Sequence, residues 1–214
     1  LLNRVQLNAH GVTVCPTMSF DERGHRENRV RYSALAFGPA NLRPEGIWAT
    51  QESFLGEGGS FAAPAAVWRR EIKPAMSLRE MQGQEALGGF RFKTVSLKAG
   101  KTARFLLVSG ISDDARDVSR WTKWARKPNA APSSLAFTKK CWTDKIARIS
   151  FGTPDKQLNN WLTWVNFQPI LRRLYGNSYL PQFDYGRGGK GWRDLWQDCL
   201  ALLLSDPKSV RPML

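Results

Sequence analysis

The stretch Arg29-Val30-Arg31-Tyr32-Ser33-Ala34-Leu35-Ala36-Phe37 decides the fold class of the first half of the chain. Val30 and Tyr32 alternate with polar residues and lead into an apolar end, which is the period-two pattern of a half-buried strand. Similar short runs, bounded by Gly, Pro or Asn, lie at residues 5–8, 12–17, 46–50, 90–97 and 102–109. Strands in series without long helices between them favour an antiparallel β-sandwich, which we predict over residues 1–112.

Other parts of this half are predicted to be loops. Residues 64–80 indicate a short helix or an irregular excursion, and the charged residues 21–28 indicate a surface loop. Glu52 and Glu57 lie beside Gly56, Gly58 and Gly59, in what we expect to be a loop at a sandwich corner.

The composition changes near Ser112 and the second half is predicted to be helical. Trp121 and Trp124 recur at helical spacing, residues 128–132 contain two prolines that break the pattern, and a second helix is expected after this break. We assign residues 113–150 to a helical linker between the sandwich and the helices predicted from residue 151 onward.

Residues 151–214 are predicted to hold the opening helices of a further domain. Thr153-Pro154-Asp155 is typical of a helix start, with threonine as the cap and proline in the first turn. Pro169 should kink the helix that begins there, and Asp206-Pro207 should begin another helix. The predicted fold class is therefore α+β, with several domains.

Residues 184–198, Asp-Tyr-Gly-Arg-Gly-Gly-Lys-Gly-Trp-Arg-Asp-Leu-Trp-Gln-Asp, join a glycine-rich basic turn to a helix. The apolar positions follow helical spacing and predict a core-facing stripe at Trp192, Leu195, Trp196, Cys199, Leu200 and Leu203. Another face gathers the polar residues Arg193, Asp194, Gln197 and Asp198. Such a face could simply be hydrated, but carboxylate, guanidinium and amide groups near aromatic rings also suit the binding of a polyol.

Composition narrows the class of partner. The 32 Lys and Arg residues exceed the 18 Asp and Glu residues among 214, giving a net charge of +14 that favours anionic ligands. The basic residues are scattered and match no known nucleic-acid-binding module, so nucleic-acid binding is an alternative function rather than the main prediction. Residues 186–191 match neither a P-loop nor a dinucleotide fingerprint.

Cysteine and histidine usage predicts neither a disulfide framework nor a metal site. The three cysteines are far apart in sequence, which fits a reducing, cytoplasmic compartment, and Cys199 is expected to be a buried thiol. His10 and His25 have no partner cluster. The sequence shows no signal segment or membrane-length apolar run, and we expect Leu1 and Leu214 to be internal positions of a longer polypeptide.

Three blocks together resemble glycoside hydrolase family 94, the cellobiose-phosphorylase-like enzymes also described as glycosyltransferase 36-like. They are residues 21–28, residues 50–60 and the stretch from Leu158-Asn159-Asn160-Trp161 through Asp198. The resemblance implies the end of a β-sandwich, a helical linker and the first helices of an (α/α)6 barrel, the last at residues 151–214. It is most specific over residues 159–207.

The activity that this resemblance implies is inverting phosphorolysis of β-glucosides or related oligosaccharides. Inorganic phosphate, the co-substrate, attacks the anomeric carbon while a carboxylic acid protonates the leaving oxygen, which yields a sugar 1-phosphate. The family's general acid and phosphate ligands are expected beyond residue 214, in the missing remainder of the barrel. The chain alone should therefore be inactive, with no catalytic residue of its own and no cofactor or metal.

The resemblance also implies substrate-binding roles for Arg187 and Asp194. Supporting contacts are expected from Arg193, Gln197, Asp198 and Trp192. Trp192 and the bulky Trp196 depart from the family pattern, which leaves the donor sugar open. The structural alternatives are a salt bridge from Arg187 to Asp184 and core positions for Trp161, Trp164, Trp192 and Trp196.

Alternative functions stay open. The main one is a non-catalytic carbohydrate-binding or domain-interaction module in which the sandwich itself holds the glycan, and a basic nucleic-acid binder is the other. We expect no membrane partner, and a homodimer stays open.

Overall fold

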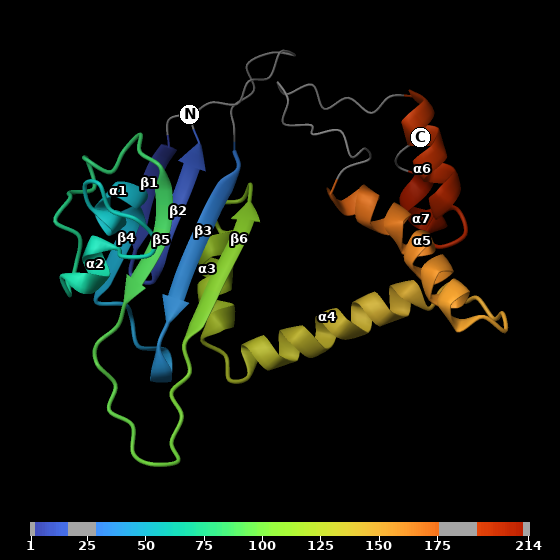
Figure 1. Cartoon of the computed structure of the whole chain (residues 1–214). Coiled ribbons are helices and arrows are strands. Elements are labelled where there is room, and N and C mark those ends of the chain that lie inside the picture. Colours follow the sequence, from blue (N-terminus) through green and yellow to red (C-terminus); the bar gives the residue numbers. More distant parts are fainter. Residues whose placement is uncertain (1–2, 17–28, 176–191, 212–214) are drawn as a thin grey trace. The chain divides into compact units, whose positions relative to one another are not determined.

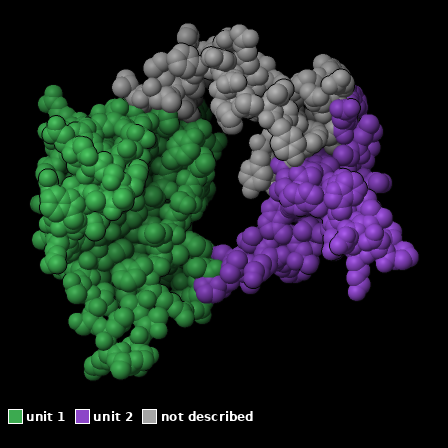
Figure 2. Space-filling view, viewed as in Figure 1, with its two compact units in different colours: residues 1–19, 26–131 green, residues 20–25, 132–214 purple. Residues whose placement is uncertain are grey.

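The computed structural model describes residues 3–16, 29–175 and 192–211. The chain divides into two compact units, shown in different colours in Figure 2. The first contains residues 1–19 and 26–131, and the second residues 20–25 and 132–214. The described residues have a mixed α+β fold with antiparallel sheets and several helices (Figure 1).

The first unit is built on a four-stranded antiparallel sheet in the order β1-β2-β3-β6. Its strands are β1 (Asn3–Asn8), β2 (Gly11–Pro16), β3 (Arg31–Phe37) and β6 (Leu106–Ser112). A second, two-stranded sheet pairs β4 (Gly46–Thr50) with β5 (Ala86–Arg91), also antiparallel. Antiparallel strands were predicted here, and this part of the prediction is confirmed.

The two faces of the four-stranded sheet pack against different partners. On one face, Val5, Val12 and Val14 form a core with Ala49 of β4 and the loop residue Met81. On the other face, Leu35 and Phe37 of β3 pack against Ala125, Trp121 and Trp124 of α3 (Asp117–Ala125). Successive side chains of a strand point to opposite faces, which is why β3 contributes to both cores.

Short helices occupy the connections of this unit. They are the 3-10 turn η1 (Pro39–Asn41), α1 (Gln51–Leu55) and α2 (Ala65–Trp68). The hydroxyl of Thr50 accepts a hydrogen bond from the Ser53 N–H (3.3 Å), so Thr50 caps α1. The prediction of a loop at Glu52 is therefore wrong, because Glu52 lies in the helix that this cap begins. The short helix predicted within residues 64–80 is present as α2.

Two predicted strands have different bounds in the structure. The strand expected at residues 90–97 ends at Arg91, and the one expected at residues 102–109 begins at Leu106. The final pairs of these ladders join Arg91 to Gly46 and Leu106 to Phe37. Beyond those pairs the partner strands β4 and β3 have ended, so the intervening residues have no ladder to join.

The second unit consists of helices. The helix α4 (Ala130–Ile146) contains the boundary between the units, and α5 (Lys156–Tyr175), α6 (Trp192–Leu202) and α7 (Pro207–Val210) come after it. The break expected at residues 128–132 is shorter than predicted, because α4 already begins at Ala130. Pro132 lies in the first turn of this helix, where the backbone N–H groups have no partner within the helix, so proline is tolerated there. The described helices of this unit do not close a barrel.

Asp155, rather than Thr153, caps α5. Its Oδ1 accepts hydrogen bonds from the N–H groups of Gln157 (2.8 Å) and Leu158 (3.1 Å). The Thr153 hydroxyl instead contacts Asn159 Oδ1 (2.8 Å). Asp206 and Pro207 begin α7 as predicted, and Pro169 lies inside α5, which continues to Tyr175.

Candidate functional site

The helix α6 carries most of the predicted sugar-binding residues and is anchored by a narrow apolar face. Cys199 (2% exposed) and Leu202 (1%) pack with Ile170 of α5 and Val210 of α7. Leu200 and Leu203 are exposed. The predicted apolar stripe is therefore wrong at these two positions and at Trp196, which is also exposed, because α5 and α7 contact the side of α6 that contains Leu202.

The buried thiol of Cys199 agrees with its prediction. The buried face of α6 also limits where a ligand could bind. Gln197 is exposed and lies two positions from Cys199, which places it on a different face of the helix. Position 193 shares a face with position 197, since residues four apart are neighbours on a helix. Positions 193 and 197 of α6 thus lie away from the core that Cys199 and Leu202 form, whereas position 198 is four residues before Leu202 and borders that core.

Several of the predicted site residues fall outside what the structure describes. Arg187 and Asp184 belong to residues 176–191, and in α6 the side chains of Trp192, Arg193, Asp194 and Asp198 are likewise outside the description. Their roles stay predictions, and Gln197, whose side chain the structure describes, is exposed.

Three tryptophans for which a core position was expected are exposed. Trp161 is 60% and Trp164 57% exposed on α5, and Trp196 is 45% exposed on α6. Trp164 still contacts Phe167, whose ring meets Trp142 edge-on at 5.4 Å between centroids. Exposed indoles are surfaces on which the apolar C–H face of a sugar could stack, and sequence spacing gave no signal that these side chains lie outside the core.

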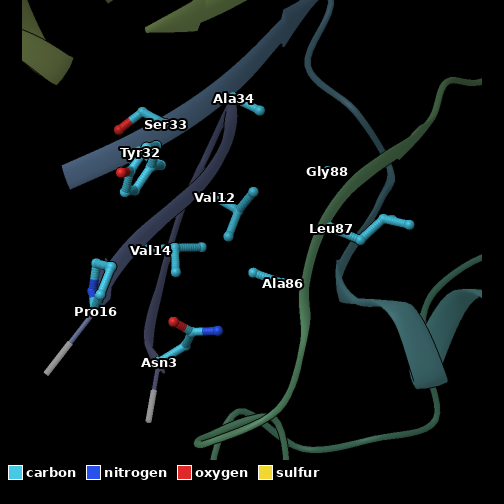
Figure 3. Close-up of a pocket in the computed structure, with 10 residues that line it drawn as sticks. All are labelled: Asn3, Val12, Val14, Pro16, Tyr32, Ser33, Ala34, Ala86, Leu87 and Gly88. Carbon is cyan, nitrogen blue, oxygen red and sulfur yellow. The ribbon is translucent and has the colours of Figure 1, made fainter. Parts of the chain in front are cut away.

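The first unit contains a separate cavity of about 400 Å³ between its two sheets (Figure 3). Val12 and Val14 of β2 approach it from one side and Ala86 of β5 from the other. Tyr32 of β3, which is half-exposed, also lines it. This cavity was not predicted, because its walls come from strands that are distant in sequence.

The chemistry of this cavity is mostly apolar. Among the described residues that line it, none carries a charge. Asn3 Nδ2 already donates to the carbonyl of Gln84 (3.0 Å), and Ser33 Oγ lies 2.9 Å from Thr13 Oγ1. Sugar recognition needs several free hydrogen-bonding groups. The cavity therefore has fewer groups that could bind a polyol than the polar positions of α6 would provide.

Three carboxylates of the first unit are poor candidates for a general acid. Arg116, through hydrogen bonds, lowers the pKa of Asp114 to about 2. Hydrogen bonds from Ser112 and Arg120 lower the pKa of Asp117, and those from Ser77 lower the pKa of Glu80. A general acid at neutral pH requires a raised pKa. These groups instead hold local structure, at the start of α3 in the case of Asp114 and Asp117.

Two further properties concern the described residues alone. Within residues 3–16, 29–175 and 192–211, no three His, Cys, Asp or Glu side chains gather in a way that could hold a metal ion. In the same residues, the helices are too short or too polar to cross a bilayer.

Comparison with known proteins finds a distant curated relative. No family model matches the chain, so the resemblance to family 94 stays a prediction. The chain is 26% identical over 171 residues to cyclic β-(1,2)-glucan synthase NdvB of Rhizobium meliloti (strain 1021). This match covers 78% of the chain but 6% of the relative, so the chain corresponds to a small part of that protein.

Proposed function

We propose that this chain is part of a carbohydrate-active enzyme in which the polar positions of α6 bind a glycosyl unit. The observation that carries the proposal is the similarity to a β-(1,2)-glucan synthase. The 171 aligned residues are more than either compact unit contains, so the alignment extends into both units. The similarity therefore concerns the combination of sheet and helices rather than one common module.

The finer proposal is an inverting phosphorylase related to glycoside hydrolase family 94. The chain would then supply the end of a β-sandwich, a helical linker and the first helices of an (α/α)6 barrel. Arg187 and Asp194 would form charge-assisted hydrogen bonds with sugar hydroxyls, which are stronger than neutral ones. Phosphate would attack the anomeric carbon, and the acid that protonates the leaving oxygen would come from beyond residue 214.

The geometry of α6 supports this assignment over a purely structural one. Cys199 and Leu202 anchor the helix, and positions 193 and 197 lie on another side of it. Gln197 is exposed and comes directly after the partly exposed Trp196. An amide next to an indole is a suitable combination for a sugar ring, whose hydroxyls need hydrogen bonds and whose C–H face needs an apolar surface.

The proposal predicts that a β-linked glucan oligosaccharide binds at α6. In a titration of the isotope-labelled chain with a linear β-(1,2)-linked gluco-oligosaccharide, amide shifts should move in residues 192–198. The substitution Asp194→Ala should weaken binding by about 1.5–3 kcal/mol, the range for hydrogen bonds to charged groups, or roughly ten- to hundredfold in Kd.

The matched control is Asp144→Ala. Asp144 forms an exposed ion pair with Lys140 at 2.9 Å on α4. The substitution of Asp144 therefore removes a surface carboxylate from a helix and leaves the residues of α6 unchanged. Affinity should be unchanged in this variant. Shifts centred on Tyr32 and β5, abolished by Tyr32→Ala, would instead favour the alternative of a carbohydrate-binding module that uses the cavity between the sheets.

A further inference from the structure

His10 occupies a fixed position in the two-residue loop between β1 and β2. The Asn8 side-chain oxygen accepts hydrogen bonds from the backbone N–H of His10 (2.8 Å) and of Gly11 (3.0 Å). The carbonyl of His10 accepts from the Ala36 N–H (2.7 Å). These three bonds tie the loop to its own hairpin and to β3, and His10 is buried, with only 3% of its surface exposed.

The contacts of the ring determine its protonation state. Nδ1 lies 3.3 Å from the carbonyl oxygen of Ala36, and Nε2 lies 2.9 Å from a guanidinium nitrogen of Arg126. A carbonyl oxygen can only accept and a guanidinium can only donate. His10 must therefore be neutral, with its proton on Nδ1 and a lone pair on Nε2. The ring also stacks on Phe37, at 4.4 Å between centroids.

The charged groups around the imidazole oppose a second proton. Arg126 faces it from the end of α3 and Arg43 from the segment between η1 and β4. Burial lowers the pKa of His10 below its ordinary value of 6.5, and the two arginines lower it further against one opposing hydrogen bond to Ala36. Protonation would turn Nε2 from an acceptor into a donor and place it against the Arg126 donor.

The partner of His10 lies where the chain leaves the sheet. Arg126 comes directly after Ala125, the last residue of α3, which is buried against Leu35 and Phe37. Four residues later Ala130 begins α4, the helix that contains the boundary between the two units. The contact between His10 and Arg126 joins residues 116 positions apart. It therefore ties the end of α3 to the β1–β2 hairpin at the point from which α4 departs.

We propose that His10 and Arg126 form an acid-sensitive latch that holds the C-terminal end of α3 on the β1–β2 hairpin. The latch is closed while His10 is neutral and opens when the imidazole gains a proton. Because the folded-state pKa is lowered, the stability that the latch contributes is fully present above the unfolded-state value of 6.5. It is lost as the pH falls from that value through the folded-state pKa.

Ring titration by NMR tests the electrostatic part of the proposal. The substitution His25→Asn leaves His10 as the one imidazole, so its pKa can be read from a single set of ring signals. The pKa should lie below 6.5, and Arg126→Gln should raise it, because this change removes a cation while an amide donor is kept. An ordinary pKa, or one that Arg126→Gln leaves unchanged, would overturn the latch.

Hydrogen exchange tests whether protonation releases the helix. In the unmodified chain, the amides of residues 122–126 should keep their protection above pH 6.5 and lose it as the pH falls below that value, after correction for the intrinsic pH dependence of exchange. His10→Gln keeps an acceptor oxygen for Arg126 but cannot titrate, so its protection should not fall. Equal loss of protection in both proteins would contradict the proposal. If this variant does not fold, the ring titrations still decide the question.

Discussion

Gly11 shows how one residue sets the spacing between β2 and β3. It pairs with Leu35 in the register of these strands. A Cβ at this position would clash with the carbonyl oxygen of Ala34 and lie 2.8 Å from the Cα of Leu35. Both contacts are backbone atoms of a central strand, which cannot rotate away as a side chain could. The absence of a side chain is therefore a requirement for the pairing of these two strands.

Replacing Gly11 with alanine should thus destabilise the first unit. We expect a loss of about 1–3 kcal/mol in the free energy of unfolding, the range for overpacking, measured by urea denaturation with circular dichroism. Gly152→Ala is the control, since a Cβ there would have no atom within 4 Å. It should leave the unfolding transitions nearly unchanged. Equal effects of the two substitutions would show that the close approach of β3 is not the constraint.

The ends of the elements explain which sequence predictions were correct. Alternation in residues 29–37 located β3 to within two residues. It did not locate the end of β5, since Phe92, Thr94 and Val95 continue a strand-like pattern after the partner β4 has ended. Strand bounds are set by pairing with distant residues, which a local pattern does not contain. The start of α5 was found, but its cap was assigned to Thr153, two residues too early.

The cap of α5 gives a prediction at the level of one helix. Asp155→Ala removes the acceptor for two N–H groups of the first turn, at Gln157 and Leu158. It should cost about 1 kcal/mol in the free energy of unfolding, as the loss of an N-cap does. Asp155→Asn retains an oxygen acceptor and should cost less. A loss for Thr153→Ala equal to that for Asp155→Ala, in the same denaturation measurement, would restore Thr153 as the cap.

For the whole molecule, burial was harder to predict than secondary structure. Trp161 and Trp164 have the spacing of core residues, yet they are exposed in the described structure because α5 packs Ile170, which is buried, and Phe167, which is partly buried, into the core instead. A helix with apolar residues on more than one side does not reveal which side meets a partner. The same limit applies to the site: the sequence located the helix α6 and the types of residue on it, whereas the arrangement of Arg187 and Asp194 around a ligand depends on tertiary contacts.

The net charge of +14 belongs to the whole molecule rather than to one site, and it leads to a prediction about polyanions. If the proposed function is correct, the scattered basic residues should bind duplex DNA only through phosphate contacts. We expect dissociation constants of about 10⁻⁴–10⁻⁶ M at physiological salt, without sequence preference, and a steep fall in affinity as salt rises, measured by fluorescence anisotropy. Binding that is much tighter for one sequence than for others at the same salt concentration would require contacts to base edges. That outcome would favour the nucleic-acid binder over the carbohydrate enzyme.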